Sequence, residues 1–119
     1  GTKAGWSIEI PSEFSTTFDV RLDQILDEPT VYLALTGSSG TLRLIWSPEN
    51  NAFALEDDFG QRVIASLVRR SGDIITFGIC QTPTARKLFA ASAQTGLSAS
   101  GVEPFLPLGA FSGAQLHPA

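Results

Sequence analysis

The acidic run Glu56-Asp57-Asp58 is the stretch of the sequence in which carboxylates are most closely clustered. Carboxylate oxygens are preferred ligands of Ca²⁺, which takes about six to eight oxygens. Three acidic side chains, together with turn carbonyls and water, would form a weak calcium site. Because aspartate is common in turns, the run also fits the solvated tip of a hairpin, and the pattern favours that interpretation. Calcium is therefore the only cofactor that the sequence suggests, and only as an alternative.

Nucleophilic catalysis needs a serine or cysteine, a histidine base and an acid that orients the base. His117 is the only histidine, and it lies close to the end of the sequence, where chains are usually mobile. A catalytic base must be held within reach of its proton, so a triad or a histidine zinc site is not expected. The single cysteine, Cys80, lies in the apolar run IITFGIC, which predicts a buried and unreactive thiol. We therefore expect that the protein is not an enzyme.

Trp46, Asn50 and Asn51 form the best candidate for a ligand site. Sugars stack on an aromatic face while amides and carboxylates reach their hydroxyls, so a tryptophan close to two asparagines is typical of such a site. Tyr32 alternates with Leu33 and is predicted to lie on an exposed face, where it would add to the binding surface. However, the same alternation places Trp46 with the leucines of its own segment, and this pattern favours a core position.

Composition limits the class of protein. The 119 residues are enough for one domain, 1–119, with 43% hydrophobic and 17% charged residues. The net charge of −4 and the pI near 4.8 argue against a nucleic-acid partner, which would require a basic surface. No apolar run is long enough for a membrane-spanning helix, so membrane insertion is not expected. The chain begins with Gly1, which is consistent with an excised or incomplete module.

Three apolar runs separated by two turn clusters form the middle of the chain, between Thr30 and Glu56. The runs are TVYLALT, TLRLIWS and AFALE, and apolar residues recur in each with a period of two. This period is typical of a strand with one buried face. The intervening GSSG and PENN have the composition of tight turns. The segment is therefore predicted to be an antiparallel meander.

Further strands are predicted on both sides of the meander. Residues 14–23 alternate cleanly between an apolar and a polar face. Residues 61–69 fit a strand or one face of a helix, and their β-branched residues favour the strand. Residues 86–93 fit either a strand or a short helix. The small, polar segment 94–104 is predicted to be a loop. The remaining predicted strands are 6–10, 74–81 (covered on both faces), 105–110 and 114–116.

About nine short strands at a spacing near ten residues predict an all-β fold. The architecture expected is an antiparallel β-sandwich of the jelly-roll type. Asp57-Asp58-Phe59-Gly60 is predicted to be a hairpin turn in which Gly60 takes a positive φ.

The order of these segments resembles a known family. SIEIPSEF is followed by FSTTFDVRLD, then by the meander, DIITFGICQ, RKLFAASAQTGL and finally FLPLGAFSG. In this order, from about Trp6 to Gly113, the chain resembles the laminin-G-like or concanavalin A-like jelly roll. Leu106-Pro107-Leu108-Gly109 matches a late strand of the family. Ile74-Ile75 replaces a Trp-His pair that is common there, and the closing strand is reduced to Ala114-Gln115-Leu116.

The resemblance implies a structural or binding module without chemistry of its own, as in adhesins and in phage tail or capsid appendages. The lack of disulfides favours a virion or bacterial surface over an animal matrix protein. The expected partners are a glycan and other protein subunits, including further copies of the chain if the reduced closing strand leaves an edge to be covered. The alternative is an accessory module of a carbohydrate-active enzyme with a weak calcium site.

Overall fold

The computed structural model describes residues 4–104 and 111–116 of the chain. In these residues it contains β-strands and no helix. The strands are β1 (Ala4–Ile10), β2 (Phe14–Arg21), β3 (Thr30–Gly37), β4 (Gly40–Ser47), β5 (Ala52–Asp57), β6 (Arg62–Ala65), β7 (Ile74–Gln81), β8 (Ala85–Ser92), β9 (Ser98–Pro104) and β10 (Phe111–Leu116).

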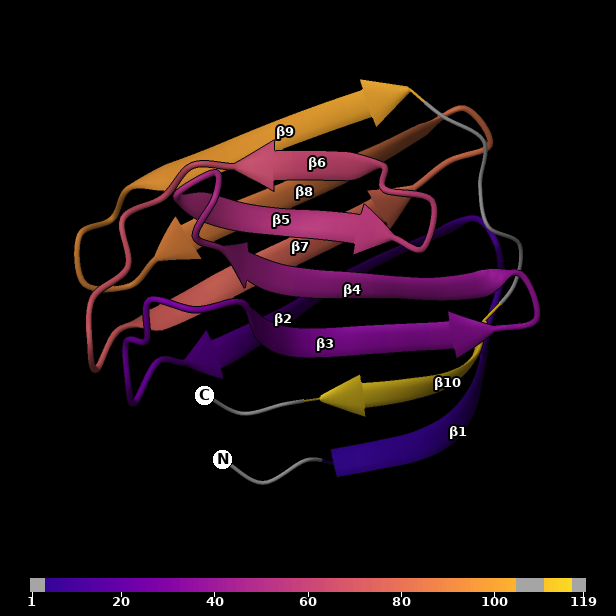
Figure 1. Ribbon diagram of the computed structural model, residues 1–119, viewed down its shortest axis with the longest axis horizontal. Helices are drawn as coiled ribbons and strands as arrows, with labels where there is room; N and C mark the ends of the chain where they lie inside the picture. Colours follow the sequence, from indigo (N-terminus) through magenta and orange to yellow (C-terminus); the bar gives the residue numbers. More distant parts are fainter. Residues whose placement is uncertain (1–3, 105–110, 117–119) are drawn as a thin grey trace.

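The strands form two antiparallel sheets that pack face to face, with the smaller sheet behind the larger one in Figure 1. The six-stranded sheet has the order β1-β10-β3-β4-β5-β6, and the four-stranded sheet has the order β2-β7-β8-β9. Every neighbouring pair is antiparallel. The predicted all-β, antiparallel β-sandwich is therefore confirmed. The predicted meander is β3, β4 and β5, which are adjacent in the larger sheet.

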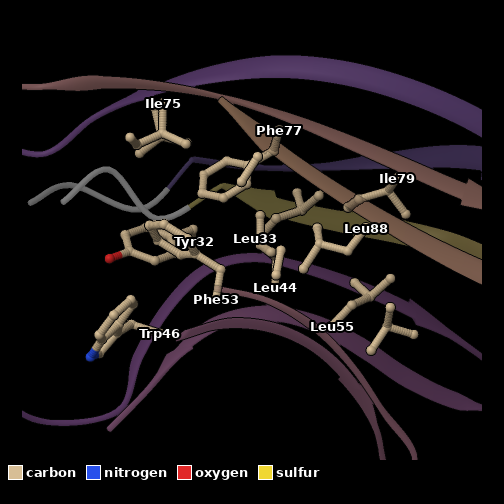
Figure 2. Close-up of a cluster of buried hydrophobic side chains, with 14 of the residues drawn as sticks. Tyr32, Leu33, Leu44, Trp46, Phe53, Leu55, Ile75, Phe77, Ile79 and Leu88 are labelled. Atoms are coloured by element: carbon tan, nitrogen blue, oxygen red, sulfur yellow. The ribbon is translucent and has the colours of Figure 1, made fainter. Parts of the chain in front are cut away.

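Alternating apolar side chains from both sheets fill the space between them (Figure 2). Phe53 of β5 meets Phe77 of β7 at the centre, with ring centroids 4.9 Å apart and the rings nearly perpendicular. Trp46 packs on Phe53 at 5.2 Å, again edge to face. Such edge-to-face pairs are favourable because a positive ring edge meets a negative ring face. The aromatic residues therefore join the two sheets through one core.

The strand β7 has one covered face, not the two that its apolar composition predicts. Ile75, Phe77 and Ile79 are buried between the sheets, whereas Gly78 and Cys80 point to the other side and are half-buried. The run is nearly continuous in apolar residues because Gly78 and Cys80 are small and uncharged, although they lie on an outer surface. The prediction of two covered faces is wrong for this reason.

Other segments settle or refine the predictions. The segment 86–93, predicted to be either a strand or a short helix, lies largely in the strand β8, and strand structure in 61–69 is limited to Arg62–Ala65. Residues 98–104, predicted to be part of a loop, form the strand β9. Gly60 has the predicted positive φ, 79°. The predicted strand 105–110, with its Leu106–Gly109 motif, lies outside the described residues, as does His117.

No helix long and apolar enough to cross a membrane occurs in the described part of the chain.

Candidate functional site

Tyr32 is buried, and the prediction that it lies on an exposed face is wrong. The pairing of β3 with β4 shifts register between Val31 and Leu33, so Tyr32 is an extra residue in the ladder. Such a bulge breaks the alternation and turns Tyr32 toward the same side as Leu33. Its ring centroid lies 5.9 Å from that of Phe77 in the opposite sheet. Burial raises the pKa of Tyr32, and the nearby Arg69 partly offsets this effect.

Trp46 also lies in the core, as its alternation favours. Only 4% of it is exposed, and the Arg69 guanidinium lies over its ring at 3.7 Å from the centroid. Asn51 lines the same small pocket as Trp46 and Arg69, of about 350 Å³. Asn50 is not among the residues that line this pocket, and its Oδ1 accepts hydrogen bonds from the Ser47 hydroxyl and from Arg62. A sugar would have to displace Arg69 to stack on Trp46, and ligand binding there stays a prediction.

The acidic run 56–58 does not converge on one point. Asp57 points between the sheets, where both it and its arginine partner are buried, whereas Glu56 and Asp58 are more exposed. Each carboxylate has its own arginine: Glu56 pairs with Arg62 at 2.8 Å, Asp57 with Arg86 at 3.4 Å and Asp58 with Arg43 at 2.8 Å.

These arginines already neutralise the charges that a calcium ion would use. The hydrogen bond from Arg43, with a second from the Thr41 backbone, lowers the pKa of Asp58. Among residues 4–104 and 111–116, no group of three or more histidine, cysteine, aspartate or glutamate side chains is placed to hold a metal ion. Calcium binding at 56–58 remains a prediction that would require the arginines to move away.

The structure forms a different site on the outer face of the four-stranded sheet. There, a groove of about 620 Å³ crosses all four strands, and we call it the outer groove. Two rows of paired residues lie along it, with one residue from each strand in a row. The first row is Thr17, Gly78, Phe89 and Ser100, and the second is Ser15, Cys80, Lys87 and Val102.

Strand alternation explains why these side chains face outward. Leu88 and Ala90 of β8 are buried between the sheets, so Lys87 and Phe89 must point to the other side. The same argument applies to Gly78 and Cys80 of β7. Phe89 therefore lies on the surface because Leu88 and Ala90, on either side of it in the strand, are buried in the core.

Gly78 lies at the centre of the groove. It lies between Thr17 and Phe89 in the first row, and it has no side chain to fill that position. A Cβ at Gly78 would lie 3.4 Å from Cβ of Phe89 and 3.7 Å from Cγ2 of Thr17. The ring of Phe89, which is 41% exposed, therefore lies in contact distance of this glycine and forms one side of the groove. Glycine within a strand often marks the close approach of a ligand.

The polar groups of the outer groove are neutral, except for one. Hydroxyls come from Ser15, Thr17 and Ser100, and Lys87 is the only charged residue among the described residues that line the groove. The thiol of Cys80 lines it as well, and this cysteine is half-buried on the outer face. The prediction of a buried Cys80 is thus corrected, because its side chain alternates away from the core. Apolar contact, hydroxyl hydrogen bonds and one cation are what the groove can offer a ligand.

Two residues of this site are unusual in the sequence, but the alternation of apolar residues does not identify them as a site. Gly78 interrupts an otherwise apolar run, and Phe89 follows directly after a core leucine in a segment of small residues. Ser100 and Val102 belong to β9, which was predicted to be a loop. The face becomes visible only when the strand pairing is known, because it combines residues from 15 to 102.

No family model matches the sequence, and no curated protein sequence matches it. Several solved structures are similar to it in fold. One is the crystal structure of the LG1-3 region of the laminin alpha2 chain, with a TM-score of 0.74 and 12% identity over 98% of this chain and 25% of that chain. Another is the enzymatically active domain of bacteriophage CBA120 tailspike protein 2, with a TM-score of 0.63 and 14% identity over 96% of this chain and 20% of that one.

A third is scytalido-glutamic peptidase with a peptide-based transition-state analogue, with a TM-score of 0.58 and 11% identity. The match covers 93% of this chain and 61% of the peptidase. In each case the chain spans less than two thirds of the protein it resembles. Identities this low show a shared fold alone, and the likeness to the laminin region and the tailspike supports a jelly-roll fold.

These likenesses correct the expectation that the protein is not an enzyme. That expectation rested on the lack of a histidine-based catalytic group and on a jelly-roll module without chemistry of its own, but the similar structures include a peptidase and an enzymatically active tailspike domain. The fold is therefore one that enzymes use, and its presence does not argue against catalysis.

Proposed function

We propose that this chain is a glycan-binding module of an extracellular or virion surface protein, and that the outer groove holds the glycan. The observation that carries the proposal is the exposed ring of Phe89 beside Gly78 in the outer groove. A sugar ring lays its apolar face on an aromatic ring, and its hydroxyls then need polar partners close by. Ser15, Thr17 and Ser100 supply such partners on both sides of Phe89.

The size of the groove supports this assignment. Its volume of about 620 Å³ lies within the range of about 300–1,000 Å³ that is usual for small-ligand sites. The proposed location is supported by the fold, which this chain shares with a laminin region and a phage tailspike domain.

The full chain should bind a subset of sugars on a glycan array. Calorimetry on the strongest of these should show that Phe89→Ser weakens binding about tenfold, because the stacking surface is lost. Phe59→Ser is the matched control: Phe59 is 71% exposed in the turn after β5, away from the groove, so binding should not change. The proposal is wrong if no glycan binds, or if the two variants weaken binding equally.

A second candidate function, subunit packing, is supported by a separate apolar cleft. The cleft has about 290 Å³ and opens between the edge strand β2 and the inner face of the larger sheet. Within the described residues, β1 and β2 are each paired on one side only. A second copy of the chain that covered this cleft would bury apolar surface and protect an edge. Its lining residues are Ile10, Phe14, Thr16, Phe18, Leu33, Leu35, Ala114 and Leu116.

Size-exclusion chromatography with light scattering tests this second function. The chain should form an oligomer that Leu116→Glu, in the cleft, converts to a monomer. Leu97→Glu, at a position that is 61% exposed between β8 and β9, should leave the oligomer intact. A chain that is monomeric at high concentration would exclude this form of subunit packing.

A further inference from the structure

Lys87 is a cation that forms no ion pair with the described residues. All ion pairs found in residues 4–104 and 111–116 use an arginine as the cation. Lys87 is exposed and takes part in none of them. No carboxylate lines the outer groove within the described part of the chain. The ammonium group of Lys87 is therefore available to a ligand.

The neighbours of Lys87 place this charge next to the proposed stacking surface. Lys87 and Phe89 are two residues apart on β8 and point to the same face, which puts their Cβ atoms about 7 Å apart. Across the sheet, Lys87 is flanked by Cys80 and Val102, and neither is an acidic residue. A substituent on a ring stacked against Phe89 would lie within reach of the flexible lysine side chain.

The charge of the whole chain limits how many negative groups a ligand can carry. The net charge is −4, so a densely charged polyanion would be repelled by the protein as a whole. The groove can neutralise one anionic group with its single lysine. A ligand with one acidic group for each stacked ring fits both the single positive charge of the groove and the net negative charge of the chain.

We infer that the outer groove selects a glycan in which the bound ring carries a single anionic group, either a carboxylate or a sulfate ester, held by Lys87. This inference rests on the proposed glycan-binding function and adds the chemical class of the ligand. Phe89 supplies affinity for the ring, and Lys87 discriminates the acidic ring from its neutral counterpart. Lys87 is thus a specificity-determining residue.

Matched pairs of sugars test the inference by calorimetry on the full chain. One pair is an oligogalacturonate and its methyl ester, in which a methyl group replaces the negative charge of each carboxylate. The other pair is a galactose oligosaccharide with and without a 6-sulfate, so the two pairs distinguish the two sources of charge. The acidic member of at least one pair should bind about threefold to tenfold more tightly. This preference should fall as salt is raised, because a single exposed ion pair is screened.

Three variants test whether Lys87 causes the preference for the acidic sugar. Lys87→Gln should abolish the preference while the neutral sugar binds as before, and Lys87→Arg should retain it. Arg70→Gln removes one positive charge at an exposed position in the turn before β7, outside the groove, and should leave the preference unchanged.

The possible failures are distinguishable. Equal binding of both members in both pairs, or a preference that survives Lys87→Gln, would overturn the role of Lys87 and leave the glycan site itself intact. If no member of either pair binds and the glycan array is also blank, the proposed function fails together with this inference. Binding of neutral glycans alone would overturn only the ligand class.

Discussion

Asp73 is a buried carboxylate that is satisfied by hydrogen bonds and not by a cation within the described residues. Its Oδ2 accepts from the Ser92 hydroxyl, and its Oδ1 accepts from the backbone N–H groups of Ile74 and Gln94 at 2.8 and 3.0 Å. Ser92 in turn accepts a hydrogen bond from the backbone of Thr95. Asp73 therefore ties the turn before β7 to the turn after β8.

These hydrogen bonds give Asp73 a role in acid stability. Burial raises the pKa of Asp73, but the hydrogen bonds from Ser92, Gln94, Ile74 and Ala93 outweigh it, and the net effect is a lowered pKa. A carboxyl group whose pKa is lower in the folded state stabilises the fold above its unfolded pKa of about 3.9. This contribution is lost as the pH falls from that value through the folded pKa.

Asp73→Asn should lower the free energy of unfolding by about 1–3 kcal/mol at pH 7. The amide NH₂ cannot accept the hydrogen bond that the Ser92 hydroxyl donates, so that buried bond and the charge it stabilises are lost. Below about pH 4 the wild type loses the stabilisation that ionised Asp73 provides, whereas the variant has no such carboxylate to protonate. The difference in unfolding free energy between the two proteins should therefore become smaller as the pH falls. Urea unfolding between pH 2 and 7 measures both effects, and Asp27→Asn at an exposed site should behave like the wild type. An unchanged pH profile in the Asp73 variant would contradict this account.

Single residues also show where sequence patterns succeed and where they fail. The alternation in β2 correctly placed Phe18 and Val20 toward the core, because that strand pairs with β7 in an unbroken register. The same rule misplaced Tyr32, because one extra residue in β3 inverts the alternation locally. A bulge depends on the partner strand, and the sequence of one strand does not reveal it.

At the level of the strands, β9 packs unusually close to β6. A Cβ on Gly101 would collide with the backbone carbonyl oxygen of Ile64 in the opposite sheet. The β6 and β9 edges of the two sheets therefore approach backbone to backbone, as the upper edge of Figure 1 shows. The small residues that this close packing requires have low strand propensity, so the sequence of β9 has the composition of a loop.

Gly101→Ala should destabilise the protein by about 1–3 kcal/mol, since the backbone of Ile64 cannot move without disturbing β6. Gly78→Ala is the matched control, because it also adds a methyl group to a strand glycine but makes only ordinary contacts of 3.4 and 3.7 Å. In thermal unfolding, the melting temperature of Gly101→Ala should be lower than that of Gly78→Ala. Equal melting temperatures would show that the two edges can separate at little cost.

At the scale of the whole molecule, a chain of polar contacts crosses the core from one sheet to the other. Asp57 of β5 pairs with Arg86 of β8, and the Arg86 Nε donates to the Gln81 Oε1 at 2.9 Å. Gln81 then donates to the carbonyl of Ser12, between β1 and β2. Burial lowers the pKa of Arg86, and the Asp57 carboxylate partly offsets this. The acidic residue that suggested a calcium site thus serves to hold the sheets together.

Arg86→Leu should cost about 3–5 kcal/mol of unfolding free energy, because it leaves the Asp57 carboxylate buried without its partner. The double variant Arg86→Leu/Asp57→Asn should recover part of this loss, since the buried charge is then removed while the side-chain Oδ1 can still accept from the turn at 59–61. Denaturant titrations of the single and double variants measure the coupling. Strictly additive losses would mean that the two residues act independently.

The fold was more predictable than the site, for a physical reason. Burial of one face imposes a period of two on each strand, and this period can be read within the strand. The outer groove depends on which strands lie side by side, because Thr17, Gly78, Phe89 and Ser100 come together only through pairing. Trp46 and Asn51 do share a pocket, but the arginine that covers the tryptophan comes from a distant loop.

The pairing of β1 with β10 has a consequence for how the protein folds. Ala4 lies opposite Leu116, so the edge of the larger sheet joins the two extremes of the described chain, which lie side by side in Figure 1. Such a contact closes a loop of nearly the whole described length, and contacts of high sequence separation form slowly. On the ribosome, β1 must wait unpaired until β10 has been synthesised, and the remaining strands of the larger sheet can pair before it does.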